Sequence, residues 1–482
     1  MNMAANKLTF AFAIFSLLLL ARARPVRAQD EPQASSENKP KPAGATSPIP
    51  LLSSGNQDAD SNNVLTPDLT PLTGVQTPTL GSPPVLHSYW EPGIQWSGSI
   101  QSNSYNQTAN SGWLMNNYFI GTVSLLQAWS GSQLAINYSG GGFISTDSTQ
   151  GNGYYHQLAL SQTFQRKRWM VQLLDQFSYL PESSFGFGGG SSLGIPGSGG
   201  SIGPVIPGMG NSYVPNQSIY TAVGPRYSNA SAVQVTYTTS PRGSITLSGS
   251  YGLLNFVNSG NVNSDVTTGT IGYNYALTRK DTIGAFYRFS AFHFSGQPEA
   301  YGDHSANLAY GRKVTGRLAL QLYGGPDFTT IRVSTNGNNV THGVNTGANL
   351  SYGFENGGLS AGYSHGISGG SGVLTGSSGD QLNFNANHQL SRIWSGQLTL
   401  GYSHNSPIAN VAQTISQSYN TWTVGGGVSR ALGRNATFSI VYNATIPDYG
   451  VSGCTGPGCS SSQTYHYVTL NIQWHARPLI LP

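Results

Sequence analysis

The sequence predicts an all-β protein: a transmembrane antiparallel up-and-down β-barrel of about 16–18 strands, preceded by a disordered N-terminal segment. Three observations support this prediction. Apolar and polar residues alternate from about Trp90 to Trp474, short and long links follow one another between the alternating segments, and charged residues make up only 8% of the chain. An ordinary soluble domain carries about 25% charged residues, because its surface relies on charge to stay dispersed.

The alternation is clearest in Thr464–Trp474. Its apolar and polar residues occupy alternate positions: Val468, Leu470, Ile472 and Trp474 against Tyr467, Thr469, Asn471 and Gln473. Since successive side chains of a strand point to opposite faces, one face is apolar and the other is polar. About ten tilted residues of this kind cross a bilayer. The pattern recurs at Leu134–Tyr138, Val233–Tyr237, Ile245–Leu253, Val344–Tyr352, Leu382–Ala386, Leu398–Tyr402 and Ala436–Tyr442.

A closed barrel fits this composition better than two other architectures. A β-sandwich also alternates, but its polar face meets solvent and carries Lys, Glu and Arg, whereas Ser, Thr, Asn, Gln and Gly fill the polar face here. A helical membrane protein is excluded because hydrophobic residues make up 38% of the chain and no apolar run reaches the roughly 20 residues of a membrane helix. Closure also removes sheet edges, which a bilayer does not tolerate.

The links between the alternating segments differ in length. Short links are expected near Ser130-Gly131, Arg166–Arg168, Pro241–Gly243, Thr278–Asp281, Val314–Arg317, Asn356-Gly357, Ser391-Arg392 and Leu432–Arg434. Longer loops are expected at about 104–117, 143–152, 181–228, 256–264, 294–302, 335–341, 366–380, 404–418 and 446–463. Together these links join about 18 strands, with short periplasmic turns and long outer loops. Gly324–Asp327, which reads Gly-Gly-Pro-Asp, predicts a bulge or bend because proline cannot donate to a ladder.

The N-terminal region divides into two predicted parts. Residues 1–28 resemble a secretory signal peptide, with an apolar run at Thr9–Leu20 and a small-residue cleavage site at Val26-Arg27-Ala28. An uncleaved anchor is the alternative, because arginines make the region before this site unusually basic. Residues 29–88 are rich in Pro, Ser, Thr and Asn without periodicity, which predicts a disordered periplasmic segment. Residues 89–482 would form the barrel.

The chain has two cysteines, Cys454 and Cys459, which enclose the turn-forming residues Thr-Gly-Pro-Gly. Export would bring them into a compartment that permits disulfides. A local disulfide that fixes a loop is the structural interpretation, and a redox pair or half of a metal site are the functional ones.

Most lysines and arginines of the predicted barrel fall at the expected short turns. They are Arg166, Lys167, Arg168, Arg242, Arg279, Lys280, Arg312, Lys313, Arg317, Arg392, Arg430 and Arg434. These residues either contact anionic headgroups, each contributing about 1 kcal/mol near the surface, or lie there because turns are hydrated.

A few charged residues fall elsewhere and are candidates for the lumen or its constriction. Arg288 shares a polar face with Gly284 and Ser290, whereas Asp303 and Arg332 are expected near the outer mouth. Two further candidates are Asp175, whose mixed surroundings are compatible with a bulge, and Glu182 at the start of a long loop. Such groups would set a local field that tunes ion preference, or would pair with each other across the wall.

No catalytic or metal-binding pattern is present in the sequence. The histidines are scattered without ligand spacing, and the nucleophile-elbow, zinc-protease and phosphate-loop patterns are absent. We therefore expect neither an enzyme nor a cofactor or metal. The formal net charge of +4 is small for 482 residues and indicates no nucleic-acid partner.

Two stretches resemble bacterial porins. Pro181-Glu182 followed by Phe187-Gly188-Gly189 is similar to a Pro-Glu-Phe-Gly-Gly run in the third outer loop of porins. The resemblance implies that 181–228 folds into the barrel and narrows it, although charged residues lie only at the ends of this stretch. Tyr467–Trp474 looks like the terminal strand that the barrel assembly machinery recognises, but His475–Pro482 extends beyond it.

These features predict a porin-like channel in the outer membrane for passive diffusion of small neutral hydrophilic solutes such as sugars. Expected partners are outer-membrane lipids, the assembly machinery and the solutes, and self-association into a homo-oligomer stays open. One alternative is a non-conducting barrel that binds ligands at the surface or acts as an envelope scaffold. Another is a conduit for polysaccharide export.

Overall fold

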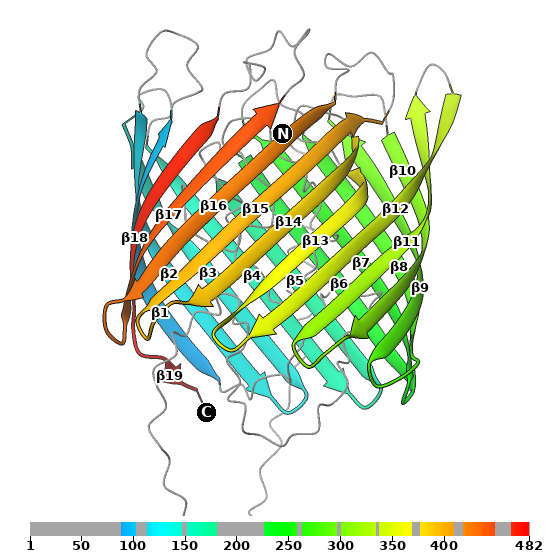
Figure 1. Cartoon of the computed structure of the whole chain (residues 1–482), viewed down its shortest axis with the longest axis horizontal. Coiled ribbons are helices and arrows are strands. Elements are labelled where there is room, and N and C mark those ends of the chain that lie inside the picture. The colour runs from blue at the N-terminus through cyan, green and yellow to red at the C-terminus, as the bar shows by residue number, and fades with distance from the viewer. Residues whose placement is uncertain are drawn as a thin grey trace, which may run out of the picture. The chain divides into compact units, whose positions relative to one another are not determined.

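The computed structural model of the chain is a closed antiparallel β-barrel (Figure 1). The structure describes residues 88–102, 113–146, 152–180, 226–257, 263–295, 300–333, 337–368, 376–408, 418–448 and 464–481. The predicted signal peptide, nearly all of the predicted disordered segment, Glu182, both cysteines and most of 181–228 lie outside the described residues.

Eighteen long strands and one very short strand form a single sheet. The strands are β1 Tyr89–Ser102, β2 Trp113–Trp129, β3 Ser132–Ser145, β4 Gly153–Arg166, β5 Trp169–Leu180, β6 Arg226–Ser240, β7 Gly243–Phe256, β8 Ser264–Ala276, β9 Asp281–Phe294, β10 Ala300–Lys313, β11 Leu318–Val333, β12 Gly337–Phe354, β13 Gly357–Ser368, β14 Ser377–Gln389, β15 Trp394–Pro407, β16 Tyr419–Ala431, β17 Ala436–Asp448, β18 Tyr465–His475 and β19 Leu479–Ile480. The predicted all-β barrel is confirmed, at the upper end of the expected strand number.

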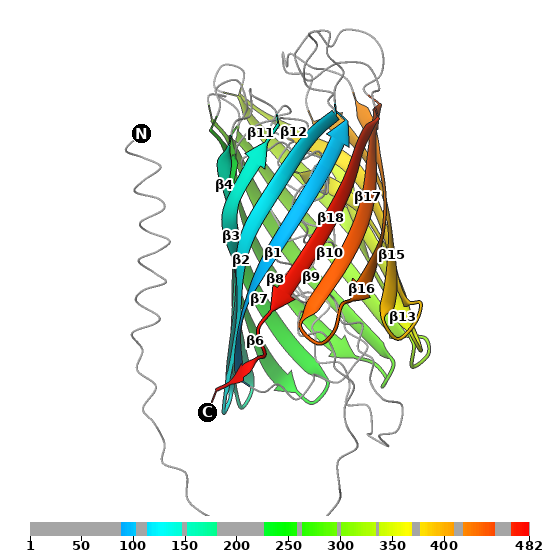
Figure 2. The same ribbon diagram turned by 90° about the vertical axis from the view of Figure 1, so that its left-hand side faces the viewer.

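The barrel closes between its first and last long strands. Gly93–Gln101 of β1 pairs with Tyr467–His475 of β18, while the other edge of β1 pairs with β2. Figure 2 shows β18 lying alongside β1. Every other long strand pairs with its two sequence neighbours, so the sheet has no open edge. The segment Thr464–Trp474, predicted as a strand with two distinct faces, is therefore the strand that closes the ring.

The residues beyond β18 continue to pair with the start of β1. The amide of Ala476 donates to the carbonyl of Pro92 at 2.8 Å. β19 then pairs with Tyr89 and Trp90, and the amide of Leu481 donates to the carbonyl of Ser88 at 3.0 Å. The extension past the terminal aromatic residue thus adds hydrogen bonds at the same seam.

Short turns join the strands at one end of the barrel, as the sequence predicted (Figure 1). Several turns use backbone conformations with positive φ: Gly131 at 85°, Lys167 at 51° and Gly433 at 116°. At Gly131 a side chain is also excluded by space, because an added Cβ would lie 2.8 Å from the carbonyl oxygen of Gln165.

Several local expectations were wrong. Strand residues occupy the ends of several expected loops, such as Trp113–Asn117 of β2 in the loop expected at 104–117. The loop expected at 335–341 is only three residues long, because β12 begins at Gly337 and its first residues pair with the end of β11. The predicted bulge at Gly324–Asp327 is absent, since β11 pairs with β12 without a register shift. On the other side of β11, the pairing with β10 has no partners for Gly325 and Pro326. This gap is expected because proline has no amide hydrogen to donate.

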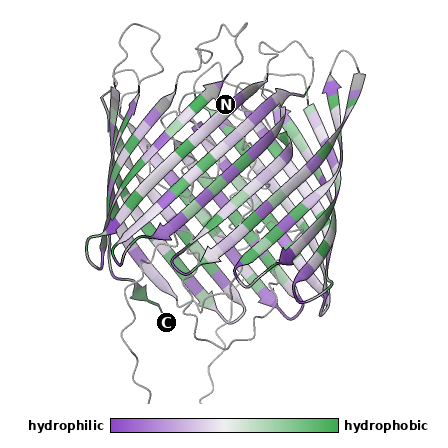
Figure 3. Ribbon diagram, in the orientation of Figure 1, coloured by the Kyte–Doolittle hydropathy of each residue, from purple (hydrophilic) through white to green (hydrophobic). Residues whose placement is uncertain are grey.

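The two faces of the barrel wall differ in chemistry, and Figure 3 shows the alternating hydropathy along the strands. On β7, Leu247 is 54% exposed on the outer face, while its neighbour Thr246 is fully buried on the inner face. Residues directly opposite in an antiparallel pair share a face, so the register extends this assignment around the ring. Among the described residues, no helix has the length and apolar character needed to span a membrane.

Aromatic pairs mark both ends of the outer face on β5 and β6. Trp169 packs against Tyr237 next to a short turn, with ring centroids 4.6 Å apart. Tyr179 stacks on Tyr227 at the other end, at 4.7 Å. Aromatic residues prefer the two interfaces of a membrane, so the apolar band between these pairs lies at the depth of the hydrocarbon core.

An arginine on the outer face should destabilise the barrel far more than an arginine on the inner face. We expect Leu400→Arg, midway along β15, to lower the free energy of unfolding in lipid vesicles by about 2–4 kcal/mol, because it places a charge in hydrocarbon. In the matched control Thr399→Arg, the arginine points inward, so the free energy of unfolding should fall much less. Denaturant titration of the folded protein measures both, and equal losses would contradict the face assignment.

Candidate functional site: the inner wall of the barrel

The inner wall is lined mainly by uncharged polar residues. On β14 the inward positions are Gln381, Asn383, Asn385 and Asn387, and on β7 they include Ser244, Thr246, Ser248 and Ser250. The charged residues and histidines that the described strands direct inward are Glu91, Arg226, Arg288, Asp303, Lys313, Asp327 and His475. Near the loop end the inner face also carries two apolar clusters, Tyr118 with Ile120, Phe143 and Tyr155, and Val266 with Phe292, Phe294, Tyr301 and Ile331.

Three of the inward charges form one cluster on adjacent strands. Arg288 lies on β9, Asp303 on β10 and Asp327 on β11. Ser305 of β10 is directly opposite both Arg288 and Asp327, and Asp303 is the next inward residue on the same strand. Asp303 is 1% exposed and Asp327 is 2% exposed. The register therefore brings a guanidinium and two carboxyl groups together, although they are far apart in sequence.

Asp303 and Asp327 lie diagonally across the β10–β11 pair, and Arg288 attracts Asp303 electrostatically. Thr329 on β11 donates its hydroxyl to Oδ1 of Asp303 at 3.3 Å. The guanidinium therefore offsets part of the negative charge of the two carboxyl groups.

Several buried polar atoms around this cluster have no hydrogen-bond partner in the described part of the chain. They are Oγ1 of Thr270, Nε of Arg288, Oδ1 of Asn307, Oδ1 of Asp327 and Oδ1 of Asn345. These residues come from five adjacent strands, β8 to β12. A buried polar atom left unpaired costs about 1–3 kcal/mol, so this patch has unused capacity to bind a hydrophilic molecule.

A second ion pair lies on the inner face at the closing seam. Nδ1 of His475 in β18 is 3.0 Å from Oε1 of Glu91 in β1, and both side chains are at least nine-tenths buried. Because the two residues lie on the two strands that close the ring, this pair contributes to the seam rather than to the cluster on β9–β11.

The structure places the sequence candidates differently. Arg288 and Asp303 lie on the inner face and belong to the same cluster. Asp327 was not predicted as a lumen residue, because the glycines and proline before it favoured a break in the strand. The alternation of β11 would have indicated its face, since Asp327, Thr329 and Ile331 are alternate residues that point inward.

Asp175 does not face the lumen. It is opposite Leu160 of β4 and Ser231 of β6, on the outer face that also carries Trp169 and Tyr179. No register shift interrupts β5, so the bulge considered for this residue is absent. Ser231 and Asn229 both donate side-chain hydrogen bonds to Oδ1 of Asp175, which offsets part of the cost of a carboxyl group within the apolar band.

Arg332 also lies on the outer face. It alternates on β11 with Ile331, which is 1% exposed and belongs to an inner apolar cluster. Near the loop end the usual polarity of the faces is therefore reversed, with apolar residues inside. This reversal explains why an arginine at the mouth is not directed into the lumen.

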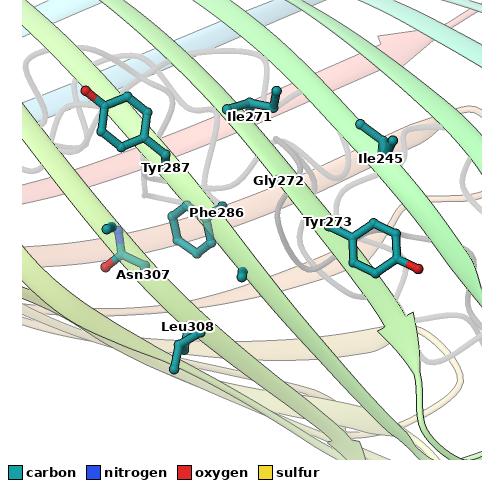
Figure 4. Close-up of a pocket in the computed structure, with 10 residues that line it drawn as sticks. Ile245, Ile271, Gly272, Tyr273, Phe286, Tyr287, Asn307 and Leu308 are labelled. Atoms are coloured by element: carbon teal, nitrogen blue, oxygen red, sulfur yellow. The ribbon is translucent and has the colours of Figure 1, made fainter.

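One shallow hollow of the wall lies outside the lumen. It is a groove of 580 Å³ on the outer face of β7–β10, lined by residues that include Ile271, Tyr273, Tyr287 and Leu308 (Figure 4). Because it opens away from the inner wall, this groove is not a path for solutes.

No family model and no curated protein matches this chain. Solved structures do match it. OccK2 (OpdF) of Pseudomonas aeruginosa has a TM-score of 0.42 at 7% identity, covering 81% of this chain and 98% of its own. A BenF-like porin from Pseudomonas fluorescens Pf-5 has a TM-score of 0.41 at 11% identity, covering 82% and 98%. OpdK of Pseudomonas aeruginosa, solved with vanillate, has a TM-score of 0.41 at 8% identity, covering 80% and 98%.

This chain has a porin-like architecture. The closed ring of 18 long strands and the opposed polar and apolar faces establish it independently of these scores. The porin-like barrel predicted from the sequence is therefore confirmed as architecture.

Removing the guanidinium of the cluster should alter ion selectivity. Arg288→Met leaves the negative charge of the Asp303–Asp327 pair unbalanced, so the ratio of cation to anion permeability should rise by a factor of a few. A unit charge about 4 Å from a passing ion contributes about 1 kcal/mol in water.

Reversal potentials in a salt gradient measure this ratio. The matched control Asp175→Asn removes a carboxyl group from the outer face and should leave the ratio unchanged. A change in the control, or an unchanged ratio in Arg288→Met, would show that the inner cluster does not set selectivity.

Proposed function

We propose that the protein is an outer-membrane channel through which small neutral hydrophilic solutes, such as sugars, diffuse passively. The observation that supports this proposal most directly is the inner wall, whose polar side chains are mostly uncharged and whose charged cluster contains both signs. Barrels of 16–18 strands are wide enough to enclose an aqueous channel. The chain would reach the outer membrane with a cleaved signal peptide and insert through the barrel assembly machinery.

The charge distribution favours neutral solutes over ions. Pores select ions with rings of like-charged side chains. Here Arg288 faces the Asp303–Asp327 pair, and Glu91 faces His475. A neutral solute with hydroxyl groups could use the unpaired atoms of Thr270, Asn307 and Asn345 without the cost of transferring a charge.

The stretch 181–228 is the proposed constriction, on the basis of its length and its resemblance to the third loop of porins. β5 ends at Leu180 and β6 begins at Arg226, so this stretch is the third of the longer connections. Glu182 would lie at its start, and its nearly uncharged sequence would narrow the channel without strong ion selectivity.

One observation favours a second function, that of a barrel closed to solutes. Several inward side chains, including Ser97, Thr246 and Thr469, are completely buried. A non-conducting barrel of this kind would serve in surface binding or as an envelope scaffold. A conduit for polysaccharide export that opens only with its partners would also be closed in isolation.

Single-channel recording of the purified full-length protein in a planar bilayer tests the channel function. We expect stable open steps, and larger steps when residues 182–225 are replaced by a short turn that leaves β6 intact, because this change would remove the narrowest part of the path. If neither protein gives conductance steps although both form the folded barrel, passive diffusion is rejected and the closed-barrel function is favoured.

Liposome swelling with matched solutes provides the control for solute preference. Glucose and glucuronate have nearly the same size and differ by one negative charge, so a neutral wall should admit glucose faster. Faster swelling with glucuronate would retain a channel but reject the preference for neutral solutes.

A further inference from the structure

The outer groove is formed by small residues between larger ones. Ala285 of β9 and Ala306 of β10 lie between the side chains of Tyr287 and Leu308, because Ala306 is opposite Tyr287 and Ala285 is opposite Leu308. Ile271 and Tyr273 of β8 form the other side (Figure 4). Leu308 is 72% exposed. The groove is apolar, faces the hydrocarbon of the bilayer and has the size of part of an acyl chain.

A histidine lies directly beyond this groove, toward the loop end. The Nδ1 atom of His304 is 2.6 Å from the hydroxyl of Tyr287, which itself lines the groove. The imidazole also packs against Phe289, with ring centroids 4.8 Å apart, and Phe328 is opposite it on β11. Tyr287 and Phe289 thus hold the ring at the point where the apolar groove ends.

The hydrogen bond to Tyr287 defines what the imidazole can offer a ligand. When the tyrosine hydroxyl donates to Nδ1, the neutral ring carries its proton on Nε2. When the ring is protonated, Nδ1 donates to the tyrosine oxygen and Nε2 still carries a proton. In both of these arrangements Nε2 of His304 is an N–H donor, and the second arrangement adds a positive charge.

The position of His304 fits the level of lipid headgroups. It is the fifth residue of β10, counted from the loop end. Outer-face histidines bonded to tyrosines recur at this level, in Tyr138–His156 at 3.0 Å and Tyr442–His466 at 2.8 Å.

We propose that His304, Tyr287 and the groove form a binding site for one lipid whose headgroup carries a phosphate. The acyl chain would lie in the groove against Ala285, Ala306 and Leu308, and a phosphate oxygen would accept a hydrogen bond from Nε2 of His304. This site depends on the outer-membrane location of the barrel and not on whether the barrel conducts.

Other charged groups near this site support an anionic ligand. Arg332 lies further toward the loop end on β11, the strand that pairs with β10. On β9, His293 is 4.0 Å from Asp265 of β8, which leaves this carboxylate paired. Arg332 is therefore the cation on the loop-end side of His304.

Native mass spectrometry of the refolded full-length protein tests the site with phosphatidic acid and diacylglycerol, two lipids that differ only in the phosphate. We expect His304→Phe to weaken phosphatidic acid binding about fivefold, as for the loss of one contact to a charged headgroup, and to leave diacylglycerol binding unchanged. Phenylalanine keeps the aromatic packing and removes the donor. Ala306→Leu fills the groove and should weaken binding of both lipids.

His156→Phe is the matched control, since it removes a tyrosine-bonded histidine at the same level but outside the groove. It should leave the tightest phosphatidic acid site intact. If His304→Phe fails to fold, Tyr287→Phe removes only the orienting hydroxyl and should weaken phosphatidic acid binding in the same direction.

Three results would overturn the proposal. The wild-type protein could bind both lipids equally, or His304→Phe and His156→Phe could cause the same loss. In addition, glycerol 3-phosphate could displace phosphatidic acid at equal concentration, which would show that a free phosphate ester binds without the groove.

Discussion

The structure depends on one constraint: no backbone amide or carbonyl can remain unpaired in hydrocarbon. A sheet satisfies this constraint only by closing, and closure here depends on the pairing of β1 with β18. The buried Glu91–His475 pair and the hydrogen bonds from Ala476 and Leu481 lie at this seam. Specific polar interactions therefore reinforce the ladder at the seam.

Closure separates two environments, and the same strands carry the chemistry of both. On β10, Asp303 and Ser305 face the inner cluster, while His304, Ala306 and Leu308 face the outside. One strand thus contributes to the proposed solute path and to the proposed lipid site. A shift of its register by one residue would place the carboxyl group in lipid and the leucine in the lumen.

The sequence was sufficient to predict the architecture, because alternation and turn residues are local signals. Thr464–Trp474 and the short turns, such as Ser130-Gly131, were located correctly. The face of individual residues was harder to predict where apolar side chains occupy both faces. Leu173 and Leu174 precede Asp175 and point to opposite faces, with Leu174 turned inward opposite Ala232. The sequence alone therefore did not determine the orientation of Asp175.

The functional cluster could not be predicted as a unit. Arg288, Asp303 and Asp327 meet only through the register of three strands, and no spacing in the sequence encodes that register. Pro326 further concealed Asp327, since a proline normally argues against a continuous strand. In β11 the proline is tolerated because its missing donor affects only the β10 side of the ladder.

The separation of a hydrated inner face from a lipid-facing outer face is the central claim, and single-cysteine labelling along β7 tests it most directly. In a background with Cys454→Ser and Cys459→Ser, cysteines are placed one at a time from Ser244 to Leu253 in protein inserted into lipid vesicles. A water-soluble thiol reagent should label the half-buried inward positions Ser244 and Ser250 and leave the outward, odd-numbered positions unlabelled. Equal labelling of both sets, or no labelling at Ser244 and Ser250, would contradict a water-filled barrel.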